Sequence, residues 1–222
     1  MYAGFIFDLD GVLIDSSRIH FTGWRKVLNE LGRDVEYETF LKSYFGRRGA
    51  DTLEQVFGKG KFTPEEAKNL SDRIDANFVD TVAQLGVPVK GAFEFIDMLK
   101  EKGRKVALAT SAPRQNVDAF LDAFSLSGVF DAEVCADNVS RGKPDPEVFL
   151  KAAALIGEKP EDCVVFEDSY PGVIAAKAAG STCVALLTTT TRKVLSKADF
   201  FIKDFTDGEL QKIFRVNAKE KV

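Results

Sequence analysis

The sequence predicts an α/β fold, a doubly wound, Rossmann-like parallel sheet core with an inserted α-helical cap domain. Short apolar runs suit strands that are covered on both faces, and helical patterns alternate with these runs. The alternation breaks after the first run, where only helical patterns follow. We therefore expect residues 1–14 and 88–222 to form the core and residues 15–87 to form the cap.

The predicted core elements follow one another in the order expected of such a sheet. The strands are GFIF (4–7), VALA (106–109), VVF (164–166), STCVALL (181–187) and ADFFI (198–202). The helical patterns of the core lie at residues 93–103, 146–157 and 172–180. Each of these patterns closes on a glycine, and the second opens on a proline, which is the usual asymmetry of helix ends.

The cap segment shows helix starts and stops but no convincing strand. A helix is predicted to begin at Ser16 or Ser17, which can cap it, and to end at Gly32. One or two further helices are predicted over residues 63–86. There Thr63 can act as the cap, followed by a proline and, three residues after the cap, by a glutamate.

Composition and sequence patterns argue against several classes of function. The net charge of -4 argues against a nucleic-acid partner, and no apolar run is long enough to span a membrane. No secretory signal pattern is found, and the three cysteines have no CxxC spacing, so we expect a cytoplasmic protein with reduced thiols. His20 is the only histidine, which excludes histidine-rich metal sites. We expect the protein to be a monomer with a small-molecule substrate.

Polar side chains follow three of the predicted strands and one Gly-Pro loop adds a lysine. Ligands of a doubly wound sheet bind beyond the carboxyl ends of the strands. Taken singly, such residues are more often caps, turn residues or solvated charges, but their coincidence at one sheet edge predicts a site. The residues are Asp8, Asp10, Thr110, Ser111, Lys143, Glu167, Asp168 and Ser169.

The charges of this set predict a metal ion. Two carboxylates about 4 Å apart repel by roughly 4 kcal/mol at an effective dielectric constant near 20. Native proteins are stable by only about 5–15 kcal/mol, and one lysine does not neutralise three or four carboxylates. Oxygen ligands without histidine or cysteine indicate Mg²⁺.

Mg²⁺, carboxylates, a lysine and hydroxyls suit phosphoryl transfer, which depends on alignment and charge neutralisation. The sequence contains neither a P-loop (GxxxxGK[ST]) nor a GxSxG elbow. The remaining nucleophile is an aspartate, which can form an aspartyl-phosphate. A second acid two residues later points to the same side of an extended segment and could transfer protons.

The segments DLDGVLIDS, ATSAP, GKPDPEVF and VFEDSYPGVIAAKAAG together resemble the four motifs of the haloacid dehalogenase superfamily, in order and over essentially the whole chain. The helical insert after the first motif is similar to the α-helical cap of the subgroup that includes β-phosphoglucomutase, sugar-phosphate phosphatases and phosphoglycolate phosphatase.

The resemblance implies a role for each core residue. It implies that Asp8 is the nucleophile and that Asp10 is the general acid and base. Thr110 and the amide of Ser111 would bind the phosphoryl group, and Lys143 would neutralise it. Mg²⁺ would be held by Asp8, the backbone carbonyl of Asp10, Asp168 and, directly or through a water, Glu167.

Substrate contacts are expected from the cap and from the segment after the second motif. His20 and Trp24 lie four residues apart and share a helix face, with core packing as the alternative at even odds. Arg47 and Arg48 could grip a phosphate or carboxylate bidentately, unless they are solvated. Arg114 is a further predicted substrate-binding residue. The mutase pattern is not fully matched, because Gly49 and Ile74 stand near the positions of its arginine and lysine.

Four functions remain open on this reading. The main hypothesis is a Mg²⁺-dependent phosphatase of a small phosphomonoester, with a sugar phosphate as the expected substrate. The second is a β-phosphoglucomutase-type isomerase. A phospho-accepting switch is disfavoured because it needs neither a cap nor Asp10, and dehalogenation because it needs neither Asp10 nor Asp168. Closure of the cap predicts hinges near residues 14–16 and 85–89.

Overall fold

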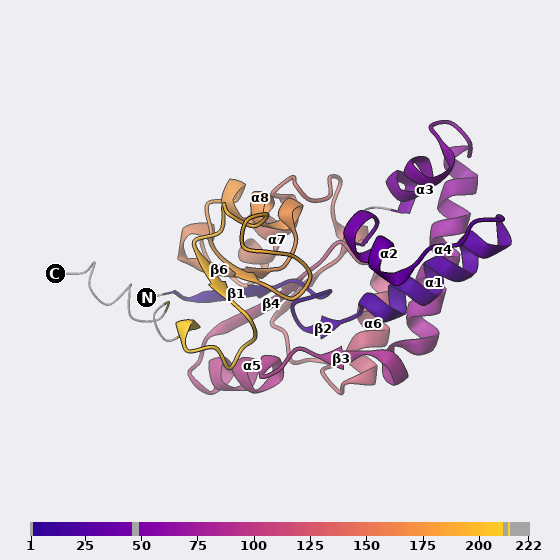
Figure 1. Cartoon of the computed structure of the whole chain (residues 1–222). Coiled ribbons are helices and arrows are strands. Elements are labelled where there is room, and N and C mark those ends of the chain that lie inside the picture. The colour runs from indigo at the N-terminus through magenta and orange to yellow at the C-terminus, as the bar shows by residue number, and fades with distance from the viewer. Residues whose placement is uncertain (1, 46–48, 211–212, 214–222) are drawn as a thin grey trace.

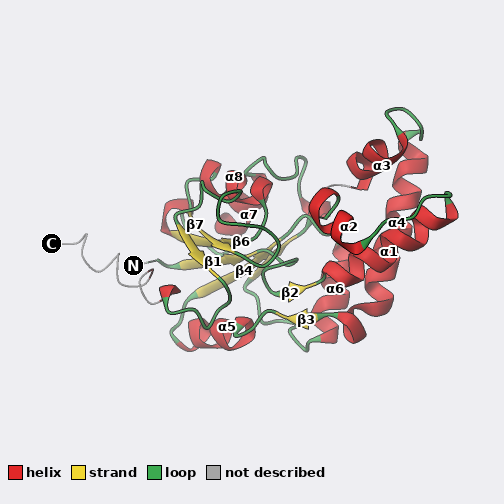
Figure 2. Ribbon diagram, viewed as in Figure 1, coloured by secondary structure: helices red, strands yellow, loops and turns green. Residues whose placement is uncertain are grey.

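A computed structural model describes residues 2–45, 49–210 and 213. Its central feature is a six-stranded parallel sheet with the strand order β5-β4-β1-β6-β7-β8. Strands of this sheet are drawn in yellow in Figure 2. The strands are β1 (Gly4–Phe7), β4 (Lys105–Ala109), β5 (Ala132–Val134), β6 (Cys163–Glu167), β7 (Thr182–Leu186) and β8 (Phe200–Ile202). The predicted parallel α/β sheet is therefore confirmed.

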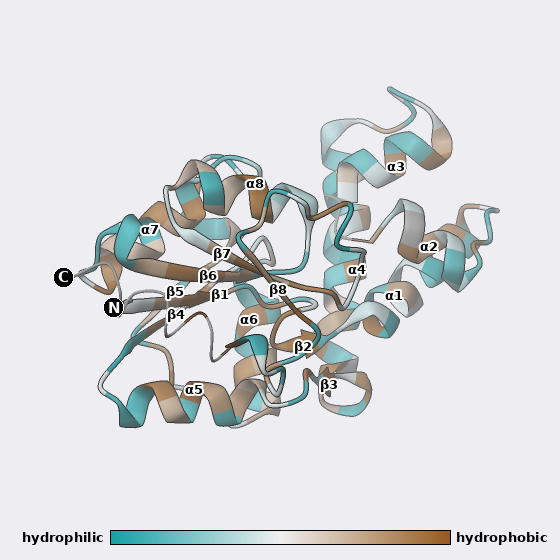
Figure 3. Cartoon of the chain, turned by 60° about the vertical axis from the view of Figure 1, so that its left-hand side comes forward, coloured by the Kyte–Doolittle hydropathy of each residue, from teal (hydrophilic) through white to brown (hydrophobic). Residues whose placement is uncertain are grey.

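Helices cover both faces of this sheet. Neighbouring residues of each buried strand point to opposite faces and therefore pack against different helices. Phe7 packs with α5 (Ala92–Glu101) and α6 (Arg114–Ala123) in one hydrophobic cluster. Ile6 packs with α7 (Glu147–Leu155) and α8 (Tyr170–Ala178) in another. The uniformly apolar strands between the two helical layers are visible in Figure 3. Two 3₁₀ turns, η1 (Ala136–Asn138) and η2 (Pro160–Asp162), connect core elements.

The inserted segment is helical, as predicted, and extends to one side of the sheet (Figure 1). It contains α1 (Ser17–Glu30), α2 (Tyr37–Ser43), α3 (Gly49–Phe57) and α4 (Pro64–Leu85). These helices enclose a hydrophobic cluster of their own, to which Trp24, Phe40 and Ile74 contribute. The segment over residues 63–86 forms a single helix, and Thr63 begins it with the predicted capping box.

The chain crosses between the sheet and the helical segment at two places that lie side by side. β2 (Ile14–Asp15) and β3 (Val87–Pro88) form a short antiparallel ribbon in which Ile14 pairs with Pro88 and Asp15 with Val87. Both crossings fall where hinges are predicted. Hinge motion itself stays a prediction.

Several elements were not predicted from the sequence, among them the short strands β2 and β3 and the two 3₁₀ turns. β5 has only three residues, one of them a glutamate, so it lacks an apolar run. α2 and α3 have seven and nine residues, which is short for a helical period to show. α6 follows the second motif directly, and its polar residues obscure its apolar face.

The topology places β1 between β4 and β6, so the strand order reverses at the carboxyl end of β1. Phe7 is in register with Leu108 and Phe166, and the residues that follow these strands therefore meet at one edge. Within the described part of the chain, no helix has both the length and the apolar character needed to cross a membrane.

Candidate active site

Asp8 and Lys143 form a buried ion pair at the end of β1. Lys143 Nζ lies 2.8 Å from Asp8 Oδ1 and 2.6 Å from Glu167 Oε1. The lysine comes from the loop before α7, and its Nζ lies 4.9 Å from the centre of the Phe149 ring. Burial alone would lower the pKa of Lys143, but the charges of Asp8 and Glu167 raise it above its ordinary value. The lysine is therefore held as a cation beside the predicted nucleophile.

Glu167 is fully buried and its two oxygens are occupied. Oε1 accepts a hydrogen bond from Lys143. Oε2 accepts from the amides of Asp168 and Ser169 and from the Ser169 hydroxyl, at 2.8 to 2.9 Å. The first turn of α8 makes room for this carboxylate through Gly172, where a Cβ would collide with it. Glu167 thus fixes both the lysine and the turn that carries Asp168.

Asp168 is held from two sides. Its Oδ2 accepts a hydrogen bond of 2.6 Å from the Thr189 hydroxyl, which belongs to the loop after β7. On the other side lies Gly11, with φ +74°, where a Cβ would collide with the Asp168 carboxylate. Burial and the charges of Glu167 and Asp8 raise the pKa of Asp168 well above its ordinary value.

The side chains of Asp8, Glu167 and Asp168 fit a divalent cation. One oxygen of each lies within 4.8 Å of the others. Asp8 Oδ1 is buried, lies 2.8 Å from the Lys143 ammonium and accepts no well-aligned hydrogen bond from the described residues. Burial raises the pKa of Asp8 to about 7, although Lys143 opposes the rise. One lysine for three carboxylates leaves negative charge that a hard cation with oxygen ligands would balance.

The Asp10 carboxylate is turned away from this cluster and toward the cap. It accepts hydrogen bonds from the Ser16 hydroxyl and from His20, whose Nε2 lies 3.1 Å from Asp10 Oδ1. Burial would raise the pKa of Asp10, but the charge and hydrogen bond of His20 and the bond from Ser16 lower it. Burial in turn would lower the pKa of His20, and Asp10 raises it. Asp10 and His20 thus form a hydrogen-bonded pair between core and cap.

The second motif borders the same edge of the sheet. Thr110 follows β4, is buried, and donates its amide to the carbonyl of Val134. Its Oγ1 accepts a hydrogen bond of 3.1 Å from the amide of Ala112, which shapes the turn. Ser111 is exposed beside it.

Two predicted substrate contacts have partners within the protein and stay predictions. Trp24 is only 6% exposed and packs in the cap cluster, which agrees with the packing alternative. The guanidinium of Arg114 is taken up by ion pairs with Glu133 at 2.7 Å and Asp118 at 3.2 Å. Its charge is therefore balanced along α6 and β5 in this structure. Arg47 and Arg48 lie outside the described residues.

Several residues that border the site were not predicted from the sequence. Ser16 contacts Asp10, and Thr188 donates a hydrogen bond of 2.6 Å to the carbonyl of Gly11. Thr188 and Thr189 begin the run TTTT, which directly follows a strand. The rule that functional residues follow strand ends could have found them. Asp75 and Asn116 were also missed, because their contact joins helices that are distant in the sequence.

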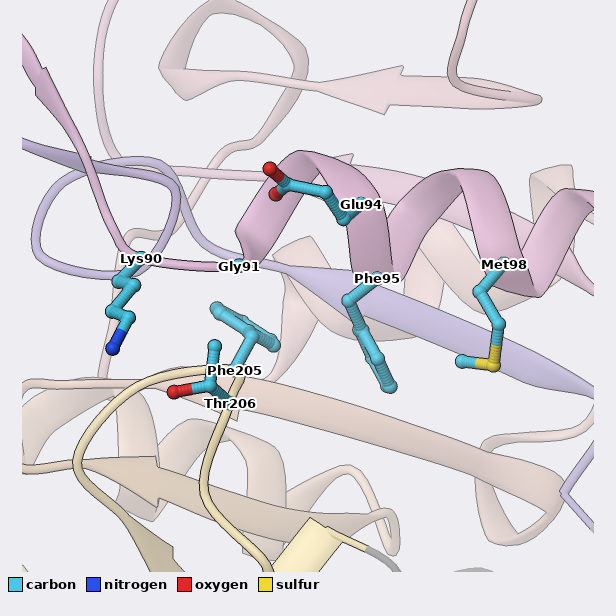
Figure 4. Close-up of a pocket in the computed structure, with 7 residues that line it drawn as sticks. All are labelled: Lys90, Gly91, Glu94, Phe95, Met98, Phe205 and Thr206. Carbon is cyan, nitrogen blue, oxygen red and sulfur yellow. The ribbon is translucent and has the colours of Figure 1, made fainter.

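A surface cavity of about 460 Å³ lies elsewhere, between α5 and the segment 205–206 (Figure 4). Phe95, Met98 and Phe205 give it an apolar wall. None of the carboxylates described above lines it, so we do not assign it to the site.

Comparison with known proteins supports the motif reading. The family model for haloacid dehalogenase-like hydrolases matches residues 2–180. The chain is 32% identical over 208 residues to validoxylamine A 7'-phosphate phosphatase of Streptomyces hygroscopicus subsp. limoneus, covering 93% of this chain and 96% of that protein. It is 30% identical over 188 residues to beta-phosphoglucomutase of Bacillus subtilis (strain 168), covering 82% and 81%. The crystal structure of a putative beta-phosphoglucomutase from Thermotoga maritima superposes with a TM-score of 0.72 at 29% identity, covering 96% and 98%.

Proposed function

The chain belongs to the haloacid dehalogenase-like hydrolases and is an enzyme of that family, and from this premise we propose that it is a Mg²⁺-dependent phosphatase. Its substrate would be a small phosphomonoester of the sugar-phosphate type. Relatives named as phosphatases support this proposal. They include hexitol phosphatase B of Escherichia coli (strain K12), which is 32% identical over 174 residues and covers 78% of each chain.

The observation that carries the proposal is the buried pairing of Asp8 with Lys143 inside a cluster of three carboxylates. Asp8 ends β1, where the strand order reverses and a ligand can approach. Its Oδ1 accepts no well-aligned hydrogen bond among the described residues, which leaves a lone pair for attack on phosphorus. The nearby ammonium of Lys143 would neutralise the developing charge.

In the first step, an oxygen of Asp8 attacks phosphorus and the bond from phosphorus to the ester oxygen breaks. The electron pair leaves on that oxygen, which takes a proton from Asp10. This gives an aspartyl-phosphate on Asp8 and a free alcohol. Because Asp10 is held as a carboxylate by His20 and Ser16, it must first gain a proton, and His20 is the titratable group beside it.

In the second step, Asp10 takes a proton from a water whose oxygen attacks phosphorus. The bond between phosphorus and Asp8 breaks, and inorganic phosphate leaves. Asp8, Asp168 and the backbone of Asp10 would hold Mg²⁺, with Glu167 beside it. The ion would supply charge neutralisation for the carboxylates and the phosphoryl oxygens.

The experiment is a panel of phosphate esters with free phosphate measured, on the wild type and on Asp8→Asn. We expect Mg²⁺-dependent release in the wild type and a loss of at least about a thousandfold in Asp8→Asn. Mass spectrometry of acid-quenched enzyme should show one added phosphoryl group in the wild type only. Full activity of Asp8→Asn would end the mechanism.

The mutase is the second candidate, because the relative from Bacillus subtilis is a beta-phosphoglucomutase. In that case a sugar hydroxyl, rather than water, would take the phosphoryl group from Asp8. Conversion of β-glucose 1-phosphate to glucose 6-phosphate without phosphate release would favour it. A phospho-accepting switch is set aside, since the family is one of hydrolases.

We also propose that residues 15–87 move as a cap over the sheet edge formed by residues 1–14 and 88–222. The paired crossings of β2 and β3 support this boundary. Closure would exclude water and bring the cap residues to the substrate.

A further inference from the structure

A second polar contact joins cap and core beside the reaction centre. Asn116 lies in the first turn of α6, the helix that begins at Arg114, three residues after Ser111. Its Nδ2 donates a hydrogen bond of 3.3 Å to Asp75 Oδ1 on the cap helix α4. The contact lies where α4 packs along α6, so it spans the seam between the two parts of the molecule.

Asn116 leaves one hydrogen-bond acceptor without a donor. The residue is only 1% exposed, and its Oδ1 has no partner within the part of the chain that the structure describes. Buried carbonyl oxygens are almost always hydrogen-bonded, so such an atom calls for a donor from a ligand or an ordered water. An amide oxygen accepts and cannot donate, which restricts the ligand group to a donor.

Asp75 extends this acceptor surface toward Asp10. Burial raises the pKa of Asp75, the charge of His20 opposes the rise, and the charge of Asp10 adds to it. Geometry places the same stretch of α4 beside this pair, because His20, the partner of Asp10, packs on Phe78 of α4 with ring centroids 5.4 Å apart. Asp75 lies one turn before Phe78 on the same helix, so its contact with Asn116 borders the pair of Asp10 and His20.

Building on the proposed function, we propose that Asp75 and Asn116 bind hydroxyl groups of the substrate's leaving alcohol and so select polyol and sugar monophosphates. The leaving alcohol would depart next to Asp10, and the Asp75–Asn116 contact lies one turn of α4 from the phenylalanine that packs on His20, the partner of Asp10. Hydroxyls can donate to the Asp75 carboxylate and to Asn116 Oδ1. A second phosphate at this place would meet the negative charges of Asp10 and Asp75, so the same residues reject bisphosphates.

The test compares three substrates with different groups beyond the ester oxygen: sorbitol 6-phosphate, p-nitrophenyl phosphate and glucose 1,6-bisphosphate. Asp75→Ala removes the acceptor, and we expect it to lower kcat/KM for sorbitol 6-phosphate about tenfold relative to p-nitrophenyl phosphate, which has no hydroxyls. Asp75→Asn removes the charge and keeps the shape. We expect it to raise kcat/KM for the bisphosphate about tenfold relative to sorbitol 6-phosphate.

Asp72→Ala is the matched control, because Asp72 lies one turn earlier on α4, where it is exposed and pairs with Lys68. It should leave all substrate ratios unchanged. Thermal unfolding of each variant distinguishes a changed ratio of kcat/KM values from a folding defect. Equal changes of kcat/KM for every substrate in the Asp75 variants would overturn the inference and leave the phosphatase standing. A wild type that hydrolyses none of the esters would overturn both.

Discussion

Single buried charges at the ends of β1 and β6 depend on one another. Lys143 is 6% exposed and balances part of the charge of Asp8 and Glu167. Replacing it with methionine keeps an unbranched side chain that is one atom shorter, but leaves these carboxylates without the lysine cation. We expect Lys143→Met to lower the free energy of unfolding by about 3–5 kcal/mol, because removing one member of a buried ion pair leaves the charge of the other without compensation.

Urea unfolding with and without Mg²⁺ measures this effect. A divalent cation at the carboxylates would replace part of the lost charge, so the loss should be smaller in Mg²⁺ than in EDTA. Phosphatase activity should fall at least about a hundredfold in either case. An equal loss of stability in both buffers would argue against metal binding at this cluster.

The hydroxyl group of Thr189 orients the Asp168 carboxylate through a hydrogen bond of 2.6 Å. Thr189→Val keeps the shape and removes the donor, so one carboxylate oxygen loses its support. We expect the affinity for Mg²⁺ to fall about tenfold, as is usual when a group that orients a metal ligand is removed. Isothermal titration calorimetry measures this directly. Thr189→Ser, which keeps a hydroxyl, should retain most of the affinity, and unchanged binding in Thr189→Val would refute the role.

At the scale of elements, the start of α7 positions the loop that carries Lys143. Glu147 lies in the first turn of α7 and accepts the amides of Ser140 and Arg141, each at 3.0 Å. The hydrogen bond from Lys151 and these amides lower the pKa of Glu147 to about 2, from an ordinary 4.5. The ionised carboxylate therefore holds the start of the loop, at Ser140 and Arg141, close to its end at α7.

A lowered carboxyl pKa has a defined effect on stability. The ionised form stabilises the folded state above about pH 4.5, and this contribution is lost as the pH falls toward 2. We expect wild type to be more stable than Glu147→Gln at pH 6 and the two to converge near pH 2. Urea unfolding at several pH values measures the gap. A gap that stays constant with pH would show that the Glu147 charge does not act on this loop.

The elements also show which parts of the fold and of the site can be predicted from the sequence. The buried strands were predictable because a strand covered on both faces is apolar along most of its length, as in residues 164–166. The residues after these strands were predictable because topology alone brings Asp8, Thr110 and Asp168 to one edge. The contact between Asp75 and Asn116 was not, because it depends on how α4 packs on α6. The same holds for Trp24, whose helix face fits both a core and a ligand.

At the scale of the whole molecule, the two crossings between core and cap determine whether the cap can move. Gly86 follows α4 at one crossing and is closely surrounded. A Cβ there would lie 2.5 Å from the Ile14 Cδ1 of the other crossing and 2.6 Å from the Val82 carbonyl oxygen. Gly86→Ala should therefore strain the junction, at a cost of about 1–3 kcal/mol in the free energy of unfolding.

Small-angle X-ray scattering tests the motion itself. In the wild type we expect the radius of gyration to fall when Mg²⁺ and orthovanadate, a phosphate analogue, are added, because residues 15–87 close over the sheet edge. In Gly86→Ala the extra methyl group at the junction should reduce this change and lower kcat. Gly208→Ala is the matched control, since a Cβ at Gly208 meets nothing within 4 Å. A radius that does not change in the wild type would mean that the cap keeps one position, and access to Asp8 would then depend on side chains alone.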